Sequence, residues 1–423
     1  MDTVADRLRP LATALLGARA PLRIRCWDGS ALGDGEAGPA LAINSPHAFR
    51  RLLYSPDELG FGRAYVAGDL DVEGDIFDFL ALRDRFAPAD RHVDMRFRRL
   101  LPLFFRVARS VGALGPPLAP PPEEARTRGR LHSKERDARA VAHHYDVGND
   151  FYRLVLGETL TYSCAYFSRR DMTLDEAQTA KYDLIARKLG LAEGMRLLDV
   201  GCGWGGMVLH AAREHGVRAV GITLSREQAE LATKRAIAAG LDDRIDIRYQ
   251  DYRDIADGPY DAIASIGMFE HVGLKQLHAY FAALSGLLRP GGRLLNHAIS
   301  KPSGRAGFDR RSFISRYVFP DGELHEVGGV VTAMQEHGLE VRDVESLREH
   351  YADTLRCWVA NLEASWAEAV ALAGEPRAKI WRLYMAGSAL AFEAGRLNVH
   401  QTLGVKPDGG RSHMPCTRSG FTS

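Results

Sequence analysis

The sequence predicts an α/β protein built on a parallel sheet, preceded by a small α+β domain. From about residue 185 onward, apolar strand-like segments alternate with amphipathic helical segments, which is typical of a parallel sheet with helices on both faces. A glycine-rich turn follows the first of these strands, and a proline-rich stretch lies upstream. Ligands of such sheets bind at the carboxyl ends of the strands, so the turn marks the expected site.

The composition is that of an ordinary globular protein. The chain has 423 residues, 46% of them hydrophobic and 26% charged, which is enough for two or three compact domains. Its 55 basic and 54 acidic residues nearly balance, so the total charge does not indicate a nucleic-acid partner. The apolar stretch at residues 11–17 is too short for a signal peptide or a membrane span. We therefore expect a cytoplasmic protein.

The cysteines indicate a reducing compartment and no metal centre. They are odd in number, widely spaced and without metal-ligand pairing patterns, so we expect free thiols. The adjacent His143 and His144 point in different directions on a helix, which does not favour a metal site either. The five cysteines are Cys26, Cys164, Cys202, Cys357 and Cys416.

Four regions are expected along the chain. Residues 1–114 form the small α+β domain, because short apolar runs alternate there with turn signals. Residues 115–139 form a proline-rich and charged linker. Residues 140–405 form the α/β domain with helical additions, and residues 406–423 are expected to be a disordered tail. The five strands expected in the α/β domain are 196–200, 219–222, 245–247, 262–266 and 293–297.

The segment 95–109 just before the linker combines five arginines with large apolar residues. This composition suits a helix that lies on an anionic lipid surface. It suits equally a helix packed within the first domain and broken by Pro102. Both interpretations stay open at the level of the sequence.

The glycine-rich turn predicts a nucleotide-like cofactor. Gly201, Gly203 and Gly205 follow the first strand, where missing side chains let the backbone approach a ligand. The preceding Asp199 suits a cofactor with an ammonium and a carboxylate but no phosphate. Asp251, just beyond the third strand, lies where such folds contact an adenine. Together these features favour S-adenosylmethionine over a dinucleotide.

The second strand departs from the usual pattern of folds that bind this cofactor. It ends in Thr223-Leu224-Ser225 and has no acidic residue for the ribose hydroxyls. Polar contacts from Thr223 and Gln228 are expected to take that role.

From His143 to Leu403 the chain resembles the cyclopropane-fatty-acyl-phospholipid synthases and the related mycolic acid cyclopropane synthases. The resemblance implies a Rossmann-like methyltransferase fold for this region. It also allows a homodimer. The motifs that carry the resemblance are residues 144–152, 161–167, the glycine turn with Thr223-Leu224-Ser225-x-x-Gln228, 269–273, 297–299, 317–322 and 350–355.

The resemblance implies two sets of site residues. Those around S-adenosylmethionine are Tyr162, Ser163, Asp199, Gly201, Gly203, Trp204, Thr223, Leu224, Ser225, Gln228, Asp251, Tyr252 and Ile266. Those around a bound bicarbonate are Cys164, Glu270, His297, Ile299 through its backbone, and Tyr351. Several members carry a cysteine where this chain has Ser388, so a covalent role for a thiol there is not supported.

The implied reaction adds a methylene carbon to the cis double bond of an unsaturated phospholipid acyl chain, at the inner face of a membrane that the protein visits from the cytoplasm. An alkene has no acidic proton, so alignment with the sulfonium methyl group and exclusion of water carry the first step. Aromatic faces then stabilise the carbocation, and a base removes a methyl proton to close the ring. The candidate aromatic residues are Tyr162, Tyr166, Phe167, Phe269 and Tyr317.

In this scheme Glu270 accepts hydrogen bonds from His297 and Tyr351. Taken singly, His297 and Tyr351 are equally well read as core residues, and Cys164 as a small buried hydrophobe.

Three other functions remain in view. The same carbocation gives a methylene or methyl branch if its charge is resolved differently. An ordinary methyltransferase for a small metabolite needs a base near a hydroxyl or amine and no anion pocket. A lipid-binding protein that keeps the fold without catalysis does not need Glu270, His297 and Tyr351 together.

Overall fold

The computed structural model describes residues 2–17, 22–33, 38–86, 93–125, 131–145, 147–305, 307, 309 and 311–422. The chain divides into two compact units, and each is described by itself. The first comprises Met1–Arg126, Arg311–Val318 and Trp366–Leu390, and the second comprises the remaining segments. The first unit therefore takes in two later segments in addition to the expected residues 1–114. Within the described residues, no helix combines the length and the apolarity needed to cross a membrane.

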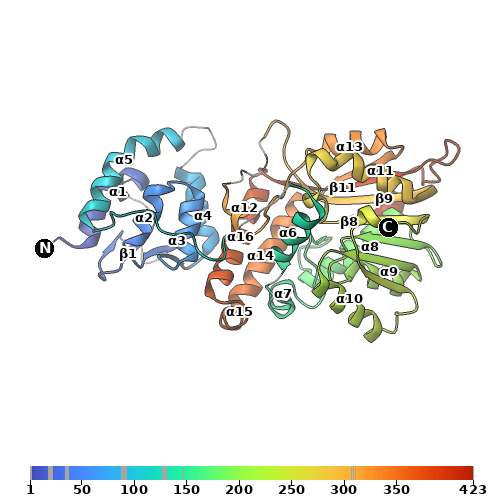
Figure 1. The fold of residues 1–423 in the computed structure, drawn as a ribbon, viewed down its shortest axis with the longest axis horizontal. Coiled ribbons are helices and arrows are strands. Elements are labelled where there is room, and N and C mark those ends of the chain that lie inside the picture. Colours follow the sequence, from blue (N-terminus) through green and yellow to red (C-terminus); the bar gives the residue numbers. More distant parts are fainter. Residues whose placement is uncertain are drawn as a thin grey trace. The chain divides into compact units, whose positions relative to one another are not determined.

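The first unit has the α+β character expected from its sequence (Figure 1). Its four-stranded sheet has the order β2-β1-β3-β4, in which only β1 and β3 run parallel. The strands are β1 (Arg23–Cys26), β2 (Ala31–Leu32), β3 (Ala40–Ile43) and β4 (Leu70–Glu73). The helices are α1 (Val4–Leu16), α2 (His47–Tyr54), α3 (Glu58–Val66), α4 (Ile76–Phe86), α5 (Val93–Ser110), α12 (Phe313–Tyr317), α15 (Trp366–Ala373) and α16 (Glu375–Glu393).

Helix α5 contains the arginine-rich segment and runs continuously through Pro102. Its inner side packs in the core of the first unit, where Phe104, Val107 and Ala108 are buried. Phe105 is 49% exposed on the same helix. Pro102 therefore does not end the helix, and part of the segment packs within the first domain. The side chains of residues 93–99, three of the five arginines among them, lie outside the described part of the chain.

The first half of the expected linker belongs to the first unit. Glu124 is buried, and Arg63 donates two hydrogen bonds to its carboxylate, each of 2.8 Å. The Tyr317 hydroxyl donates to the same carboxylate at 3.4 Å, so this predicted site aromatic lies in the first unit and packs on Phe313. The backbone of residues 114–125 has no regular helix or strand, as the prolines predict.

The second unit is built on a seven-stranded sheet of order β10-β11-β9-β8-β5-β6-β7 (Figure 1). Strands β5 to β9 pair in parallel, as predicted, whereas β11 runs antiparallel to both β9 and β10. The strands are β5 (Arg196–Val200), β6 (Arg218–Thr223), β7 (Ile245–Tyr249), β8 (Tyr260–Ile266), β9 (Leu288–Ser300), β10 (Glu340–Ser346) and β11 (Asn398–Val405).

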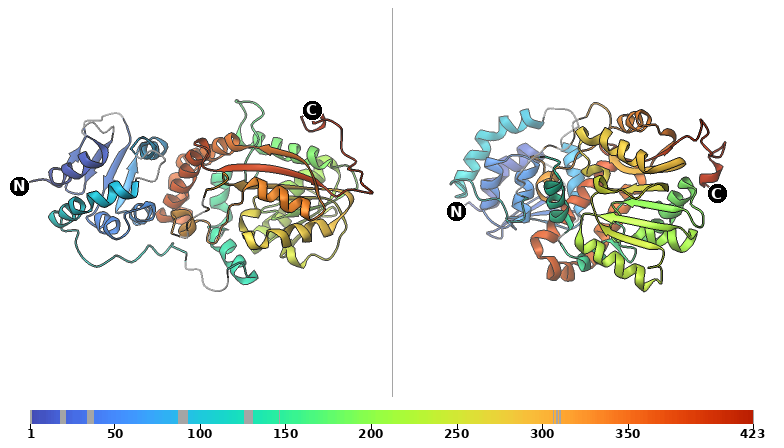
Figure 2. Two further views of the ribbon diagram at one scale, coloured as in Figure 1. Left: turned by 90° about the horizontal axis from the view of Figure 1, so that it is seen from above. Right: turned by 45° about the vertical axis from the view of Figure 1, so that its right-hand side comes forward.

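Helices cover both faces of this sheet, as Figure 2 shows. One core cluster joins the sheet to α8 and α9, and the other joins it to α11 and α13. The helices are α6 (Lys134–Tyr145), α7 (Asn149–Leu156), α8 (Leu174–Leu189), α9 (Gly206–His215), α10 (Arg226–Ala238), α11 (Leu277–Leu287), α13 (Val327–Glu336), α14 (Arg348–Ala364) and α17 (Ser419–Thr422). Three 3-10 turns are η1 (Tyr252–Asp254), η2 (Phe269–His271) and η3 (Leu274–Gln276).

The C-terminal tail contributes to the core of the second unit. Residues 406–422 are described, and the Phe421 side chain is 6% exposed within the cluster formed with α8 and α9. The Phe421 carbonyl oxygen accepts a hydrogen bond of 3.1 Å from Arg187. The tail therefore does not follow the expectation of disorder for residues 406–423.

Replacing Phe421 with alanine tests this packing. Phe421→Ala is expected to lower the free energy of unfolding by about 3 kcal/mol, because it removes a buried aromatic ring. Ile237→Ala on α10 is the matched control, since that side chain is 58% exposed and its loss is expected to cost little. Denaturant unfolding monitors both variants, and equal small losses would contradict a packed tail.

Candidate functional site

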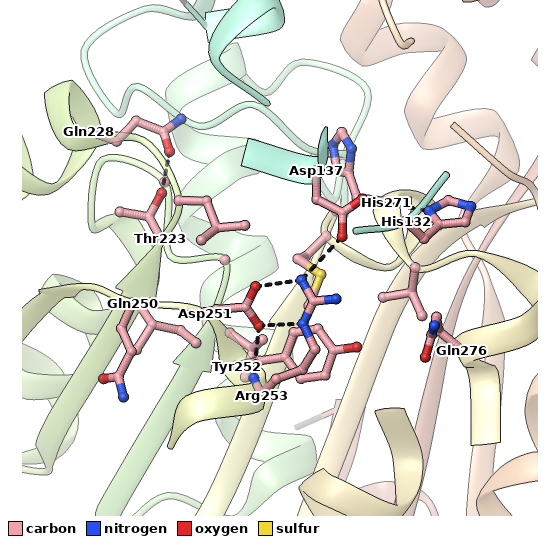
Figure 3. A pocket seen from close by; sticks show the side chains of 18 of the residues that line it. His132, Asp137, Thr223, Gln228, Gln250, Asp251, Tyr252, Arg253, His271 and Gln276 are labelled. Carbon is pink, nitrogen blue, oxygen red and sulfur yellow. Dashed lines mark hydrogen bonds and ion pairs between the residues drawn. The ribbon is translucent and has the colours of Figure 1, made fainter. Parts of the chain in front are cut away.

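A pocket opens at the carboxyl ends of β5, β6 and β8 in the second unit (Figure 3). This is the edge at which the sequence predicts a ligand. Seven of the predicted cofactor residues line it: Gly201, Gly203, Thr223, Leu224, Gln228, Asp251 and Tyr252.

The glycine turn brings backbone to the floor of the pocket. Gly201 and Gly203 have positive φ angles of 84° and 54°. A side chain at Gly201 would collide with Met268, whose Cβ would lie 2.7 Å from the added carbon. Nothing lies within 4 Å of a carbon added at Gly203, so that position faces open space. The backbone of the turn is thus accessible to a ligand, whereas residues with side chains at these positions would cover it.

The end of β6 supplies a set of neutral polar groups. The Thr223 hydroxyl donates to Gln228 Oε1 at 2.7 Å and accepts from the Ser225 amide at 3.1 Å. Ser225 caps α10, because its hydroxyl accepts from the Gln228 amide at 3.3 Å. Thr223 and Gln228 therefore reach the pocket as a fixed pair, whereas Ser225 acts on the helix and does not line the pocket.

Asp251 follows β7 and is held as an ionised carboxylate. Its oxygens accept hydrogen bonds from Arg253 Nε at 2.8 Å and Nη2 at 2.6 Å. Burial would raise the pKa of Asp251, but the hydrogen bonds and charge of Arg253 outweigh it and lower that pKa. Arg253 also contacts Asp137 of α6 at 3.1 Å, as Figure 3 shows. A segment assigned to the linker from its sequence thus lines the pocket.

Two predicted cofactor residues lie just behind the pocket wall. A carbon added at the lining residue Gly267 would lie 3.8 Å from both Ser163 Cβ and the Tyr162 carbonyl oxygen. The Tyr162 ring stacks on Trp358 with a centroid distance of 5.2 Å. Trp204 donates to Asn149 Oδ1 at 2.7 Å, within the motif at residues 144–152.

The remaining predicted cofactor residues are in the sheet. Asp199 is 2% exposed within β5, and its Oδ1 has no hydrogen-bond partner among the described residues. Ile266 ends β8 and packs against the cluster of α8 and α9. Neither side chain lines the pocket.

Three of the predicted anion ligands come together where β8 and β9 pair. Glu270 lies in η2, and its Oε1 accepts a hydrogen bond of 2.7 Å from the Ile299 amide. His297 lies in β9 opposite Ile266 and Gln401, and its Nδ1 is 3.3 Å from Gln401 Nε2. Glu270 Oε2 and His297 Nε2 are both buried and have no hydrogen-bond partner among the described residues.

This geometry corrects one expectation. The hydrogen bond predicted from His297 to Glu270 is not formed, because the His297 Nδ1 faces Gln401 and its Nε2 has no partner. The Ile299 backbone, expected to contact the bound anion, donates its amide hydrogen to Glu270.

Cys164 and Tyr351 meet at one backbone group. The Leu347 carbonyl oxygen lies 3.6 Å from the Cys164 thiol and accepts a hydrogen bond of 3.1 Å from the Tyr351 amide. Tyr351 begins the buried side of α14, where its ring packs edge-on to Trp358 at 6.1 Å. Since Trp358 also stacks on Tyr162, one aromatic chain joins Tyr351 to the cofactor side of the site.

Burial favours the neutral forms of Glu270, His297 and Cys164. It raises the pKa of Glu270 to about 7 against an ordinary value of 4.5. It lowers the pKa of His297 well below its ordinary range, an effect to which the charges of Lys181 and Lys188 add. It also raises the pKa of the Cys164 thiol, so that this residue is no thiolate. The group can exchange protons but carries little charge of its own.

Sequence reasoning missed Lys181 of α8, whose ammonium donates to Ser163 Oγ at 2.9 Å. It also missed His132 and His271, which line the pocket, where burial lowers the pKa of His271 to about 4. Lys181 gave no signal, because a lysine in an amphipathic helix ordinarily faces solvent. Ser388 is buried within α16 of the first unit.

Known proteins resemble this chain over most of its length. The family model described as mycolic acid cyclopropane synthetase matches residues 132–402. A probable fatty acid methyltransferase of Mycobacterium tuberculosis is 46% identical over 400 residues, which cover 92% of this chain and 92% of the relative. The cyclopropane-fatty-acyl-phospholipid synthase of Escherichia coli is 33% identical over 371 residues, which cover 88% of each. The solved structure of mycolic acid cyclopropane synthase CmaA1 complexed with SAH and CTAB is 38% identical with a TM-score of 0.60, and the match covers 63% of this chain and 98% of that one.

The raised pKa of Glu270 predicts a specific dependence of stability on pH. Between pH 4.5 and 7 the folded protein holds a proton that the unfolded chain releases, so the free energy of unfolding falls as the pH rises through this window. The free energy of unfolding of Glu270→Gln should not decline in this way. The difference in unfolding free energy between this variant and the wild type should therefore shift by about 3 kcal/mol in favour of the variant across the window. Denaturant titrations at several pH values measure it, with the exposed Glu227→Gln as control. A difference that does not change with pH would contradict a buried Glu270 with a raised pKa.

Proposed function

Because the chain belongs to the mycolic acid cyclopropane synthetase family, we propose that it converts the cis double bond of an unsaturated phospholipid acyl chain into a cyclopropane ring. Members of this family are S-adenosylmethionine-dependent methyltransferases of the cyclopropane synthase type. The observation that carries the proposal is that Glu270 Oε2 and His297 Nε2 are both buried and have no hydrogen-bond partner among the described residues, so both are available to a ligand.

The pocket fits S-adenosylmethionine as the methyl donor. The open backbone at Gly203 admits a ligand without a clash, and the ionised Asp251 provides an acceptor for hydroxyl or amino hydrogens. Thr223 and Gln228 offer further polar contacts where many related folds use an acidic residue. Tyr162 and Ser163 lie behind the lining residue Gly267, which precedes Glu270 closely in the chain.

The acceptor is an alkene, so the protein has no nucleophile to deprotonate before the methyl transfer. Its residues must bring the double bond to the sulfonium methyl group and keep water away, and alignment of this kind is worth about 7 to 11 kcal/mol. The stacked rings of Tyr162 and Trp358, with Tyr351 edge-on to Trp358, form an aromatic cluster behind the pocket wall, and ring faces carry partial negative charge. Such faces favour positive charge on the acyl chain where water would quench it.

The neutral group around Glu270 fits a bicarbonate ion that has one hydroxyl hydrogen and several acceptor oxygens. In its ionised form Glu270 would accept the hydroxyl hydrogen through Oε2, and His297 Nε2 would donate to an oxygen. When bound, bicarbonate supplies the base that removes the methyl proton. Glu270 is suited to hold or release that proton near neutral pH, because burial raises its pKa to about 7.

A methyl or methylene branch at the same double bond is the second candidate product. It is favoured by the similarity to the fatty acid methyltransferase of Mycobacterium tuberculosis, which extends over 92% of this chain. Both products arise from one carbocation, and they differ in the proton that leaves or in the arrival of a hydride. The residues around Glu270 are compatible with either product, so only the chemical structure of the product distinguishes the two candidate functions.

The first test is the structure of the product. Incubation with labelled S-adenosylmethionine and vesicles of mono-unsaturated phospholipid should give a labelled acyl chain whose proton NMR spectrum shows cyclopropane hydrogens. Vesicles of the saturated lipid are the control and should remain unlabelled. Branched-chain signals would establish the second candidate, and label on a hydroxyl or amine would refute both.

In the same assay, Glu270→Ala should lower turnover about 100-fold, because a proton transfer loses its partner, while its affinity for S-adenosylhomocysteine stays close to that of the wild type. Equal losses in turnover and affinity would instead place Glu270 among the groups that position the methyl donor.

We further propose that α5 carries the protein to the membrane surface. Its described outer side presents Leu101, Phe105, Arg106 and Arg109 to solvent, which combines apolar and cationic groups. A lipid substrate requires the cytoplasmic protein to reach the inner face of the membrane as a peripheral visitor, and anionic headgroups attract such a surface.

Charge reversal tests this surface. Arg106→Glu with Arg109→Glu should weaken binding to vesicles of anionic phospholipid by at least tenfold, since each cation near such a surface contributes about 1 kcal/mol. Arg213→Glu with Arg218→Glu is the matched control, because it makes the same charge change at exposed positions of the second unit. Vesicle co-sedimentation measures both, and identical binding of the two double variants would remove α5 from the lipid-facing surface.

A further inference from the structure

Three lysines are buried among the described residues, and one of them differs from the others. Lys181, Lys188 and Lys379 are 0%, 1% and 4% exposed. A buried ammonium loses hydration worth several kcal/mol, and proteins normally compensate with carboxylates. The compensating carboxylates of the other two are Asp343 and Glu345, at 2.9 and 2.5 Å from Lys188 Nζ, and Asp71 and Glu375, both at 3.0 Å from Lys379 Nζ.

Lys181 has no such partner. Among the described residues, no carboxylate oxygen lies within the 4.0 Å of an ion pair from its Nζ. Its ammonium donates one hydrogen bond, to Ser163 Oγ at 2.9 Å, and lies 4.1 Å from the centroid of the Tyr182 ring. An ammonium has three donors, so two of them have no acceptor among the described residues, although the side chain is fully buried.

The surroundings of Lys181 are those of the candidate site. Ser163 is adjacent in the chain to Cys164, and both precede α8, whose Gln178 also donates to the Ser163 carbonyl oxygen at 2.9 Å. A positive charge on Lys181 opposes the rise that burial causes in the pKa of Cys164 and adds to the fall that burial causes in the pKa of His297. Burial also lowers the pKa of Lys181 itself to about 7 and raises that of Asp199 to about 7, and each of these two groups opposes the effect on the other. An anion beside Lys181 would raise the pKa of the lysine again and favour its ammonium form.

None of the residues proposed to bind bicarbonate carries a positive charge. The Cys164 thiol and the His297 ring are neutral because burial opposes their charged forms, and Glu270 becomes negative when it releases its proton. A buried anion beside such groups would have hydrogen bonds but no opposite charge, and binding would not offset its desolvation.

We propose that Lys181 supplies the positive charge of a subsite for a carboxylate-like anion beneath the cofactor pocket, and that the anion completes the pairing that Lys181 lacks. The inference rests on the proposed function, because two anions of this chemistry belong to it: bicarbonate and the carboxylate of S-adenosylmethionine. Lys181 acts through Ser163 and through its charge, as a residue that positions the anion.

The test compares the wild type with Lys181→Met and Lys181→Arg in direct binding measurements. Sodium bicarbonate is titrated in CO2-free buffer against sodium chloride at equal ionic strength, with the thermal unfolding midpoint as readout. S-adenosylhomocysteine and methylthioadenosine, which lacks the carboxylate, are titrated by calorimetry. Lys181→Met should weaken one of the two anionic ligands by on the order of tenfold, and Lys181→Arg should restore part of the loss.

The pattern identifies the anion. Loss of the bicarbonate response assigns Lys181 to bicarbonate, whereas weaker S-adenosylhomocysteine with unchanged methylthioadenosine assigns it to the cofactor carboxylate. Unchanged affinity for both anionic ligands, or equal loss for both nucleosides, overturns the inference. Failure of the proposed function appears separately, as the absence of a modified acyl chain in the product assay with wild-type protein.

Stability provides the matched control. Lys181→Met removes a buried cation without a carboxylate partner, so its unfolding midpoint without ligands should equal or exceed that of the wild type. Lys188→Met in the same helix leaves Asp343 without its lysine and should lower the midpoint. A large loss of stability in Lys181→Met would show a structural role and also contradict the inference.

Discussion

The pairing of β9 between β8 and β11 is the constraint on which the candidate site depends. It sets His297 opposite Ile266 on one side and Gln401 on the other. It also brings the Ile299 amide to Glu270, which follows β8 in the next turn of the chain. A slip of one residue in this register would turn His297 to the opposite face of the sheet. His297 and Ile299 are therefore fixed by a central strand, whereas Glu270 lies in a short 3-10 turn and is held by its hydrogen bond to Ile299.

The interior around this pairing keeps polar atoms that a stable core would satisfy. Glu270 Oε2, His297 Nε2 and Asp199 Oδ1 are all buried without hydrogen-bond partners among the described residues. Each such atom costs about 1 to 3 kcal/mol in the folded state. Elsewhere in the same unit the chain pairs a buried Lys188 with two carboxylates, so it has the means to satisfy buried charge. These three atoms belong to β5, β9 and the turn after β8, where a ligand could satisfy them, whereas other unpartnered atoms, such as His215 Nε2, lie elsewhere in the unit.

Much of the sheet could be predicted from sequence, and the contacts within the site could not. Strands β5 and β8 gave a signal because they are buried on both faces and almost continuously apolar. The edge strand β7 is only partly buried and gave an alternating pattern instead. Strand β10 is half exposed at the sheet edge, so Glu340–Ser346 reads as a polar segment. Asp251 could be predicted from its position after a strand. The hydrogen-bond partner of Glu270 could not, because strand register determines that Ile299, and not the predicted His297, donates to it. Lys181 was missed because a lysine in an amphipathic helix ordinarily faces solvent, whereas this side chain is buried against Ser163.

The charge that the reaction moves explains why a buried cation is compatible with this chemistry. Methyl transfer shifts one positive charge from the sulfonium to the acyl chain and creates none. A fixed charge at Lys181 therefore disfavours the states before and after the transfer by similar amounts, and uniform effects of this kind leave the barrier nearly unchanged. The anion proposed beside Lys181 would favour both states in the same way, and it would then be available to accept the proton that leaves the chain. On this proposal the lysine would serve to hold the base and would have little effect on the rate of methyl transfer. It would also supply a positive charge to a site whose other ligands, such as Cys164 and His297, favour their neutral forms.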